Sequence, residues 1–324
     1  MAEKTVYLHV GQGKTGSSYI QSAFALSIDT LAQNGIEYPI DERSAARAGS
    51  GLISSGNVLP TKDSFEEVVT KNYTQSQPSL LLSNEGLFDL MQKENLHQIL
   101  AKNLPDHRIK LIVFIRDPLE HAVSAYHQII KRGGYTESFD KFLEKFSRLA
   151  RDRKVFRRLS QFDMDMTIKN YSRHKKTVLA VMEEFLSLPE GALKKPEVDV
   201  VNRSLTRAEL ELQRAFNVHF GHGTSGYVSD RFCNRLPEIP SEKPIVSRES
   251  LKGYLDSSRE HANVLARYIS EEERHYIPDV DEAMASFEGQ GDDDSFSFSA
   301  AQLDTFVSGL QEFIKIRVNQ GKNG

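Results

Sequence analysis

The segment from Thr5 to Gln21 constrains the fold of this chain more than any other part of the sequence. Its apolar beginning, Val6 to Val10, predicts a buried strand. A loop of glycine, lysine, threonine and serine follows, and the apolar residues behind that loop recur at helical spacing (Ile20, Ala23, Phe24, Ile28 and Leu31). Close backbone approach at glycine, the N-terminus of a helix and a lysine all favour binding of an oxyanion. The segment therefore predicts a strand, loop and helix that bind a phosphorylated nucleotide.

This loop differs from the ATP-binding Walker loop. A Walker loop has glycine five positions before its Gly-Lys pair, and here that position is Leu8, inside the strand. The loop is therefore shorter, and we expect it to enclose one phosphate rather than a triphosphate with its metal ion. After the apolar strand Ile109–Ile115 comes Arg116, where a kinase tends to have a metal-binding aspartate. A glycine-rich turn can also be a simple tight connection, but lysine, threonine and two serines together favour phosphate binding.

Two stretches resemble the signatures of sulfotransferases that use 3′-phosphoadenosine 5′-phosphosulfate (PAPS). The run Gly11–Ser18 (GQGKTGSS) is similar to the 5′-phosphosulfate loop of that family. The stretch IKLIVFIRDPLEHAVSAYHQ is similar to the second signature, a strand followed by an arginine and then by a serine one to two turns into the next helix. Arg116 and Ser124 hold those places. Considered singly, Arg116 also fits a surface salt bridge and Ser124 an ordinary helix face, but the two signatures occur in the order of the family.

Local chemistry independently predicts a helix after Arg116. Asp117 suits the N-cap, Pro118 the first helical position, and Glu120 the partner position of a capping box. Weaker similarities extend the resemblance over Thr5 to Asn217. SLLLSNEGLF resembles a strand of carbohydrate-type sulfotransferases that ends in a carboxylate, and NYSRHKKTVLAV and VNRSLTRAELELQRAFN resemble later segments of bacterial members.

The resemblance implies roles for the matching residues. The 5′-phosphate would be held by donors of the loop (Gly13, Lys14, Thr15, Gly16, Ser17 and Ser18), and the 3′-phosphate by Arg116 and Ser124. Lys14 would also stabilise negative charge on the bridging oxygen of the leaving phosphate. Arg203, within VNRSL, would close over the adenosine or its 3′-phosphate, and a surface arginine is the alternative. PAPS is the expected donor and 3′-phosphoadenosine 5′-phosphate (PAP) the product, and no metal is expected because a sulfuryl group is monoanionic.

Sulfotransferases use a histidine or a glutamate to remove the proton of the acceptor, and the sequence offers both. Glu85 follows the strand LLLS, at the sheet edge where parallel α/β folds bind ligands. His9 lies in the first strand just before the loop, and its alternative is a core histidine with satisfied hydrogen bonds. We rank Glu85 above His9 as the catalytic base. The histidine motif of the cytosolic small-molecule enzymes is not found here, which favours a carbohydrate-like acceptor.

The hydrophobic pattern predicts an α/β protein with a P-loop-like, three-layer fold, in which helices flank a central parallel sheet and a helical extension follows. Strands are expected at Thr5–Val10, Ile36–Tyr38, Leu80–Ser83, Lys110–Ile115 and Val178–Val181. We expect a PAPS-binding core over residues 1–217 and a C-terminal loop and helical extension over residues 218–324, packed on the core as one continuous domain.

Two later helix starts are marked by capping boxes. Thr206 and Glu209 form the first, with Leu205 and Leu210 spaced as a hydrophobic staple. Ser299 and Gln302 cap the last helix, whose apolar residues share one face that we expect to be buried (Leu303, Phe306, Val307, Leu310, Phe313 and Ile314).

Composition narrows the class of protein. The 324 residues, 39% of them hydrophobic, suffice for a substantial core, and the formal net charge of −4 argues against a nucleic-acid-binding protein. The basic runs Arg148–Arg158 and Lys169–Lys176 are either solvated helix faces or a rim for an anionic substrate. Cys233 is the single cysteine, and the sequence shows no long apolar run and no signal segment. Among the sulfotransferases that the chain resembles, the Golgi enzymes of animals have an N-terminal membrane anchor, so these features favour a bacterial-type cytoplasmic enzyme.

The expected function is transfer of a sulfuryl group from PAPS to a hydroxyl or amine of a small-molecule or glycan acceptor. Two alternatives stay open. A nucleotide or small-molecule kinase on the same kind of sheet would bind ATP with Mg²⁺, whereas a non-catalytic nucleotide-binding protein would bind without turnover. The histidines are scattered and lack the spacing of a zinc site.

Overall fold

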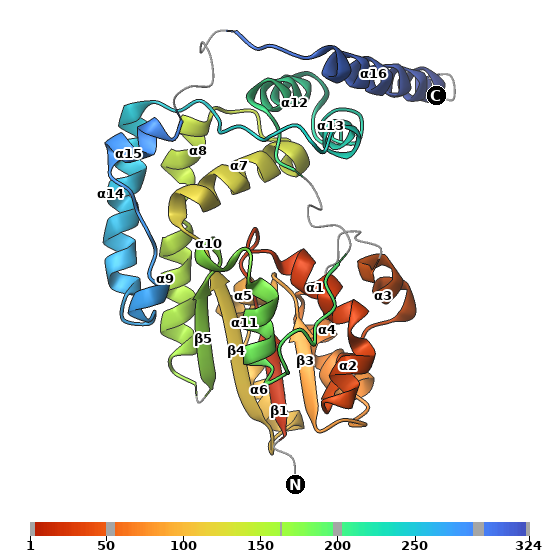
Figure 1. Ribbon diagram of the computed structural model, residues 1–324, viewed down its shortest axis with the longest axis vertical. Coiled ribbons are helices and arrows are strands. Elements are labelled where there is room, and N and C mark those ends of the chain that lie inside the picture. The colour runs from red at the N-terminus through yellow and green to blue at the C-terminus, as the bar shows by residue number, and fades with distance from the viewer. Residues whose placement is uncertain (1–3, 50–55, 163, 197–202, 288–294, 322–324) are drawn as a thin grey trace. The chain divides into compact units, whose positions relative to one another are not determined.

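The computed structural model describes residues 4–49, 56–162, 164–196, 203–287 and 295–321, and Figure 1 shows their helices and strands. The chain forms two compact units, each built from three separate segments. Unit 1 comprises Met1–Pro118, Arg148–Val201 and Glu260–Tyr276. Unit 2 comprises Leu119–Ser147, Asn202–Arg259 and Ile277–Gly324. Residues 217 and 218, between which the sequence suggested a boundary, both lie in helix α12 (Arg207–Phe220).

Unit 1 contains a five-stranded, all-parallel sheet with the order β2-β3-β1-β4-β5. Its strands are β1 (Thr5–His9), β2 (Ile36–Glu37), β3 (Ser79–Ser83), β4 (Arg108–Ile115) and β5 (Asp165–Asn170). Val6 of β1 lies opposite Leu80 of β3 and Ile109 of β4, so β1 is central. The chain builds β2 and β3 on one side of β1 and then crosses to β4 and β5 on the other. Open parallel sheets bind ligands beyond the carboxyl ends of their strands at such a reversal.

Alternate side chains of the central strands enter two hydrophobic cores, one on each face of the sheet. Tyr7 belongs to one core, whereas its neighbours Val6 and Leu8 belong to the other. The core of Tyr7 includes residues of α1 (Ser17–Leu26), α2 (Ile28–Gln33) and α11 (Val178–Phe185). The opposite core includes residues of α4 (Lys62–Glu67), η1 (Val68–Asn72), α5 (Leu87–Lys93), α6 (Leu96–Asn103) and α9 (Arg148–Leu159). Figure 1 shows α11 in front of the sheet and α5 and α6 behind it, which confirms an α/β fold with a parallel sheet flanked by helices.

Four of the five expected strands are confirmed, and the expected strand at Val178–Val181 is wrong. These residues lie in α11, where Val178, Leu179 and Met182 are buried along one helical face. A short apolar run fits a helix as well as a strand, and periodicity alone does not separate the two. The fifth strand is instead the edge strand β5, in which Ile168 is the only buried apolar residue among six described positions. Three short elements complete unit 1, namely α3 (Glu42–Gly49), α10 (Tyr171–His174) and η2 (Glu271–Glu273).

The described part of unit 2 is built from helices. They are α8 (Phe139–Lys145), α12, α13 (Ser229–Arg235), α15 (Val280–Ala285) and α16 (Ala300–Gly321), with most residues of α7 (Pro118–Gly133) and α14 (Arg248–Leu265). Their core contains large aromatic side chains such as Tyr126, Phe139 and Phe232, each of which is at most 1% exposed. The capping box predicted at the start of α12 is confirmed, and the two staple residues Leu205 and Leu210 are fully buried in the same core.

The last helix, α16, is also capped as predicted. The backbone N–H of Ser299 donates to Gln302 Oε1, and the backbone N–H of Gln302 donates to Ser299 Oγ. Phe306, Leu310 and Phe313 contact the core of unit 2. The other half of the apolar face is 50–60% exposed (Leu303, Val307 and Ile314). The expected burial of this face is therefore confirmed for Phe306, Leu310 and Phe313 and wrong for Leu303, Val307 and Ile314.

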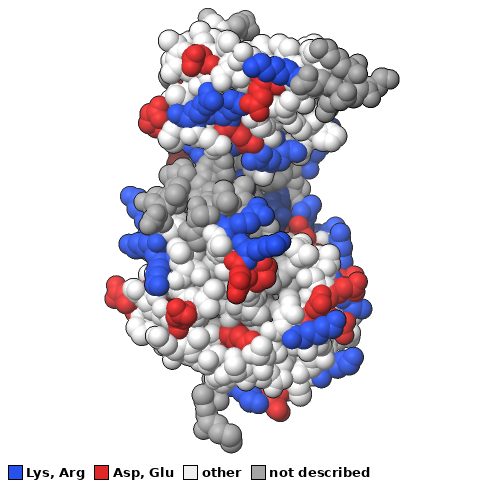
Figure 2. Space-filling model, turned by 90° about the vertical axis from the view of Figure 1, so that its right-hand side faces the viewer, with Lys and Arg blue, Asp and Glu red and all other residues white. Residues whose placement is uncertain are grey.

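Charges of both signs occur on the face of the molecule that Figure 2 shows. Figure 2 shows lysine and arginine side chains interspersed with aspartate and glutamate on the visible face. Neighbouring charges of opposite sign weaken the long-range potential of such a surface. Among the described residues, no helix combines the length and the apolar character that a bilayer crossing requires.

Candidate functional site

The loop after β1 has the backbone geometry of an anion-binding turn. Lys14 and Gly16 adopt left-handed conformations, with φ angles of 73° and 79°. Glycine adopts this conformation without penalty, whereas for a lysine it costs roughly 1–2 kcal/mol. Left-handed residues within a tight turn orient successive backbone N–H groups toward one point, where they form a concavity for anions. Gln75 and Ser187 also have positive φ angles, so the strain at Lys14 gains its meaning from its place between β1 and a helix N-terminus.

The N-terminus of α1 adds to this concavity. The helix begins at Ser17, its N-cap Gly16 provides no side-chain hydrogen bond, and its first turn contains no acidic residue. The positive end of the helix dipole is therefore not neutralised by its own side chains and favours an anionic ligand. Thr15 is fully buried, and its hydroxyl donates to the carbonyl oxygen of Gln12 at 2.6 Å. In this structure the Thr15 hydroxyl thus stabilises the loop itself.

Several buried polar atoms surround the loop. Ser17 Oγ, His9 Nε2 and both side-chain amide atoms of Gln12 are buried and have no hydrogen-bond partner among the described residues. A buried polar atom without a partner costs about 1–3 kcal/mol, so a group of them indicates a polar ligand or water. Gly11 keeps the space beside them open, because a Cβ atom there would lie 2.5 Å from Ser17 Oγ. The donors among these atoms, the Ser17 hydroxyl and the Gln12 side-chain N–H group, fit a phosphate group.

Arg116, the arginine of the second signature, contacts the loop. It follows the last residue of β4, and its Nη1 donates to the carbonyl oxygen of Lys14 at 2.9 Å. The ring of Tyr171, the first residue of α10, lies 5.8 Å from the Arg116 guanidinium carbon. The same ring packs on Gly16, where a Cβ atom would come within 2.6 Å of it. Asp117 Oδ1 accepts hydrogen bonds from Asn170 and from the backbone of Tyr276, which holds the end of β4 beside β5.

Glu85 lies two residues beyond the end of β3. The preceding residue, Asn84, donates its backbone N–H to the carbonyl oxygen of His9 at the end of β1. The Glu85 side chain is accessible to solvent, but the protein atoms around it desolvate the carboxyl group and raise its pKa. The positive charges of Lys14 and Arg148 act in the opposite direction. Glu85 and Lys14 therefore interact electrostatically, as a base and a charge-stabilising lysine at one site would.

His9 occupies a different environment. Its side chain is fully buried, its Nδ1 lies 2.8 Å from Ser83 Oγ, and its ring contacts Phe24 and Phe114 edge-on. Burial lowers the pKa of His9 to about 3, so the imidazole is neutral at physiological pH and accepts a proton poorly. This environment favours Glu85 over His9 as the base.

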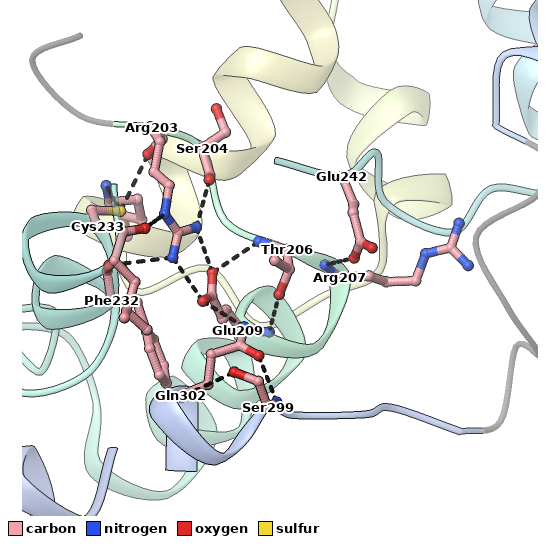
Figure 3. Close-up of polar contacts among 12 residues, drawn as sticks. Arg203, Ser204, Thr206, Arg207, Glu209, Phe232, Cys233, Glu242, Ser299 and Gln302 are labelled. Atoms are coloured by element: carbon pink, nitrogen blue, oxygen red, sulfur yellow. Dashed lines mark hydrogen bonds and ion pairs between the residues drawn. The ribbon is translucent and has the colours of Figure 1, made fainter. Parts of the chain in front are cut away.

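The two remaining residues of the predicted set lie in unit 2. Ser124 is a partly exposed residue of α7. Arg203 is 7% exposed and is therefore not a surface arginine. Figure 3 shows its guanidinium group surrounded by acceptors. Its five N–H donors are used by the Glu209 carboxylate and by three backbone carbonyl oxygens, those of Ser204, Phe232 and Leu236. Nucleotide contacts by Arg203 would require these bonds to open, so the structure favours a stabilising role.

The structure also places three residues at the site that sequence reasoning did not assign. Tyr171 contacts Gly16 and Arg116, and Arg148 lowers the pKa of Glu85 from the first position of α9. Asp152, one turn further along α9, is fully buried and pairs with Arg148. The sequence signal for this pair was the single acidic residue at i+4 spacing inside the basic run Arg148–Arg158. The signal for Tyr171 was its place within NYSRHKK.

Comparison of the sequence with protein-family models gives no match, and a search of curated proteins gives none. Within the described residues, no group of three or more histidine, cysteine, aspartate or glutamate side chains is arranged to hold a metal ion.

Proposed function

We propose that this chain is a PAPS-dependent sulfotransferase that transfers a sulfuryl group to a hydroxyl or amine of a carbohydrate-like acceptor. The observation that supports this most is the hydrogen bond from Arg116 to the Lys14 carbonyl oxygen. It joins the two segments that resemble the 5′- and 3′-phosphate signatures, although they are far apart in the chain. A nucleotide with phosphates on both the 5′ and the 3′ position is the ligand that would engage both segments at once.

Different residues would bind the 5′-phosphate and the 3′-phosphate of such a nucleotide. The backbone N–H groups of residues 13–18 and the uncapped start of α1 would hold the 5′-phosphate. Arg116 would hold the 3′-phosphate through charged hydrogen bonds. The resemblance implies that Ser124 also binds this phosphate. PAPS supplies the activated sulfuryl group.

Lys14 and Glu85 would perform the chemistry. As the acceptor oxygen forms a bond to sulfur, the bond from sulfur to the bridging phosphate oxygen breaks and negative charge grows on that oxygen. The Lys14 ammonium group stabilises this charge. Glu85 accepts the proton that leaves the acceptor hydroxyl, and its geometry matters more than its resting pKa because the hydroxyl becomes acidic only during transfer.

A ligand comparison tests this proposal. We expect PAP to raise the unfolding temperature of the chain far more than AMP does, and at 100 times its dissociation constant to stabilise it by about 2.7 kcal/mol. Stronger stabilisation by ATP with Mg²⁺ than by PAP would support a kinase instead. Transfer of labelled sulfuryl from PAPS to a panel of glycans and small alcohols then separates an enzyme from a non-catalytic binder, which would bind PAP without turnover.

A further inference from the structure

Helix α16 is held against unit 2 along one side. Gly309 packs on the segment before α13, where a Cβ atom on this glycine would lie 2.0 Å from the carbonyl oxygen of Tyr227. Ser308 Oγ accepts hydrogen bonds from Arg231 at 3.4 Å and from Arg235 at 3.1 Å. Figure 1 shows α13 next to this helix. Contacts this close fix the rotation of α16 about its axis, so its opposite side cannot turn inward.

The outward side of α16 presents an apolar stripe, which comprises Leu303, Val307, Ile314 and Val318. Each of these side chains is 50–60% exposed, and the partly buried Leu310 lies between the two pairs. At 3.6 residues per turn, the four side chains fall within about 60° of the helix circumference and extend over about 22 Å. A contiguous exposed apolar surface on a protein indicates a contact with another molecule.

The stripe is symmetrical along the helix. Its centre lies midway between residues 310 and 311, because Leu303 and Val318 are equally distant from that point, and so are Val307 and Ile314. An antiparallel second copy of α16 therefore places Val318 opposite Leu303 and Ile314 opposite Val307, twice over. A contact in which the same surface serves both copies is the isologous contact of a two-fold dimer.

The charges beside the stripe have the same symmetry. Asp304 and Lys315 are exposed and lie on one flank, about 70° and 90° from the centre of the stripe, where coiled coils have their charged e and g positions. Neither side chain has a hydrogen bond or ion pair among the described residues. In the antiparallel pair, Asp304 of each copy comes within about 3 Å of the height of Lys315 of the other. A parallel pair would separate these charges by about three turns.

We propose that α16 is a dimerisation helix, whose apolar stripe is covered by α16 of a second copy running antiparallel. This pairing does not require the proposed sulfotransferase function. A membrane surface fits the stripe less well, because helices that lie on membranes carry lysine and arginine beside their apolar face, whereas Asp304 is acidic. A single pair of helices is a small contact compared with the roughly 1,600 Å² of a standard interface, so we expect a reversible dimer with a micromolar dissociation constant.

Sedimentation velocity over a range of micromolar concentrations tests the dimer. The unaltered chain should pass from monomer to dimer as its concentration rises. Val307→Asp should weaken the association by at least about 100-fold, because it places a charge in the apolar contact. Val218→Asp is the matched control, since Val218 is 58% exposed, close to the 60% of Val307, but belongs to α12. A chain that stays monomeric throughout, or a dimer that Val307→Asp leaves intact, would overturn the proposal.

Charge reversal tests the antiparallel register itself. Asp304→Lys alone and Lys315→Asp alone should each weaken the dimer about 3–30-fold, because two equivalent attractive contacts become repulsive. The two changes combined should restore the affinity, since the pair forms again with its signs exchanged. Both positions are exposed, so the variants should unfold at nearly the temperature of the unaltered chain. A combined variant that associates no better than the single ones would contradict the antiparallel arrangement.

Binding to lipid vesicles separates the alternative occupant. Vesicles of neutral and of anionic phospholipid should not sediment the chain. Sedimentation with vesicles that Val307→Asp abolishes, in a chain that remains monomeric in solution, would assign the stripe to a membrane surface instead.

Discussion

Lys14 combines three structural features. Its backbone is held at a φ of 73°, its carbonyl oxygen accepts a hydrogen bond from Arg116, and its ammonium group lowers the pKa of Glu85. The first two shape the loop, and only the third depends on the side chain. Substitution at this position therefore separates the binding of the phosphate by backbone groups from the stabilisation of charge by the lysine.

Lys14→Ala should depress turnover far more than it weakens PAP binding. Backbone donors of the loop remain in the variant, but the charge that stabilises the bridging oxygen in the transition state is lost. Steady-state kinetics with a model acceptor, compared with calorimetric affinity for PAP, measures the two effects. Near-normal turnover in this variant would show that Lys14 does not stabilise the transition state and contributes at most to nucleotide binding.

Glu85→Gln should reduce turnover about 10²–10⁴-fold while the affinity for PAP stays nearly unchanged, because the amide keeps the shape of the side chain but cannot accept the proton. Since desolvation raises the pKa of Glu85, the proposed activity of the unaltered protein should fall as the pH decreases through that raised value, where the carboxylate becomes protonated. His9→Asn should act through stability alone. An active Glu85→Gln beside a folded but inactive His9→Asn would reverse the assignment.

At the scale of elements, two helix N-termini of unit 2 are joined through their caps. Glu209, in the capping box of α12, accepts a hydrogen bond from the side-chain amide of Gln302, which caps α16. Arg203 completes the buried network that Figure 3 shows. Burial alone would raise the pKa of Glu209, but the hydrogen bonds from Arg203, Gln302 and Thr206 outweigh it and lower the pKa. This carboxylate therefore contributes stability above its unfolded-state pKa, and the contribution is lost as the pH falls through the folded value.

Arg203→Ala should destabilise the protein by about 3–5 kcal/mol, because it leaves the Glu209 carboxylate buried without its partner. Arg248→Ala is the matched control in unit 2, since Arg248 and its partner Asp281 are 55% and 79% exposed and such pairs contribute about 0–1 kcal/mol. Denaturant unfolding measures both. Calorimetry on folded Arg203→Ala should show unchanged PAP affinity. A large loss of PAP affinity in this variant would show that Arg203 contacts the nucleotide.

Features set by neighbouring residues were predictable from the sequence, whereas features set by distant contacts were not. The caps of α12 and α16 and the order of strand, loop and helix from β1 to α1 depend on residues a few positions apart, and these structural predictions are confirmed. The choice between helix and strand at Val178–Val181 depends on packing against the sheet, and the prediction failed there. The spacing of Asp152 from Arg148 was visible in the sequence, but its burial beside Gln12 was not, because that burial exists only after α9 has packed on the sheet.

At the scale of the whole molecule, the sheet order places the ends of β3, β1 and β4 side by side. Glu85, Lys14 and Arg116 follow these three strands in the same order. The sequence predicted each of the three from its own local motif. Their proximity is a consequence of parallel pairing, which brings the carboxyl ends of neighbouring strands to one edge.

Arg116→Ala should weaken PAP binding on the order of ten-fold or more, because a charged hydrogen bond of this kind contributes roughly 1.5–3 kcal/mol. Some affinity for AMP should also be lost, since Arg116 supports the Lys14 carbonyl oxygen. The informative quantity is the ratio of the PAP and AMP affinities, which should be large in the unaltered protein and fall toward one in the variant. Equal affinities for the two nucleotides in the unaltered protein would refute the assignment of Arg116 to the 3′-phosphate.

Contacts within the protein hold the loop after β1 in place without a ligand. Thr15 bonds to Gln12, Arg116 bonds to Lys14, and the Tyr171 ring packs on Gly16. Little chain entropy is then lost on binding, and no slow rearrangement of the loop has to precede it. Binding of the proposed nucleotide to this loop should therefore be a single step, and its observed rate should rise linearly with nucleotide concentration.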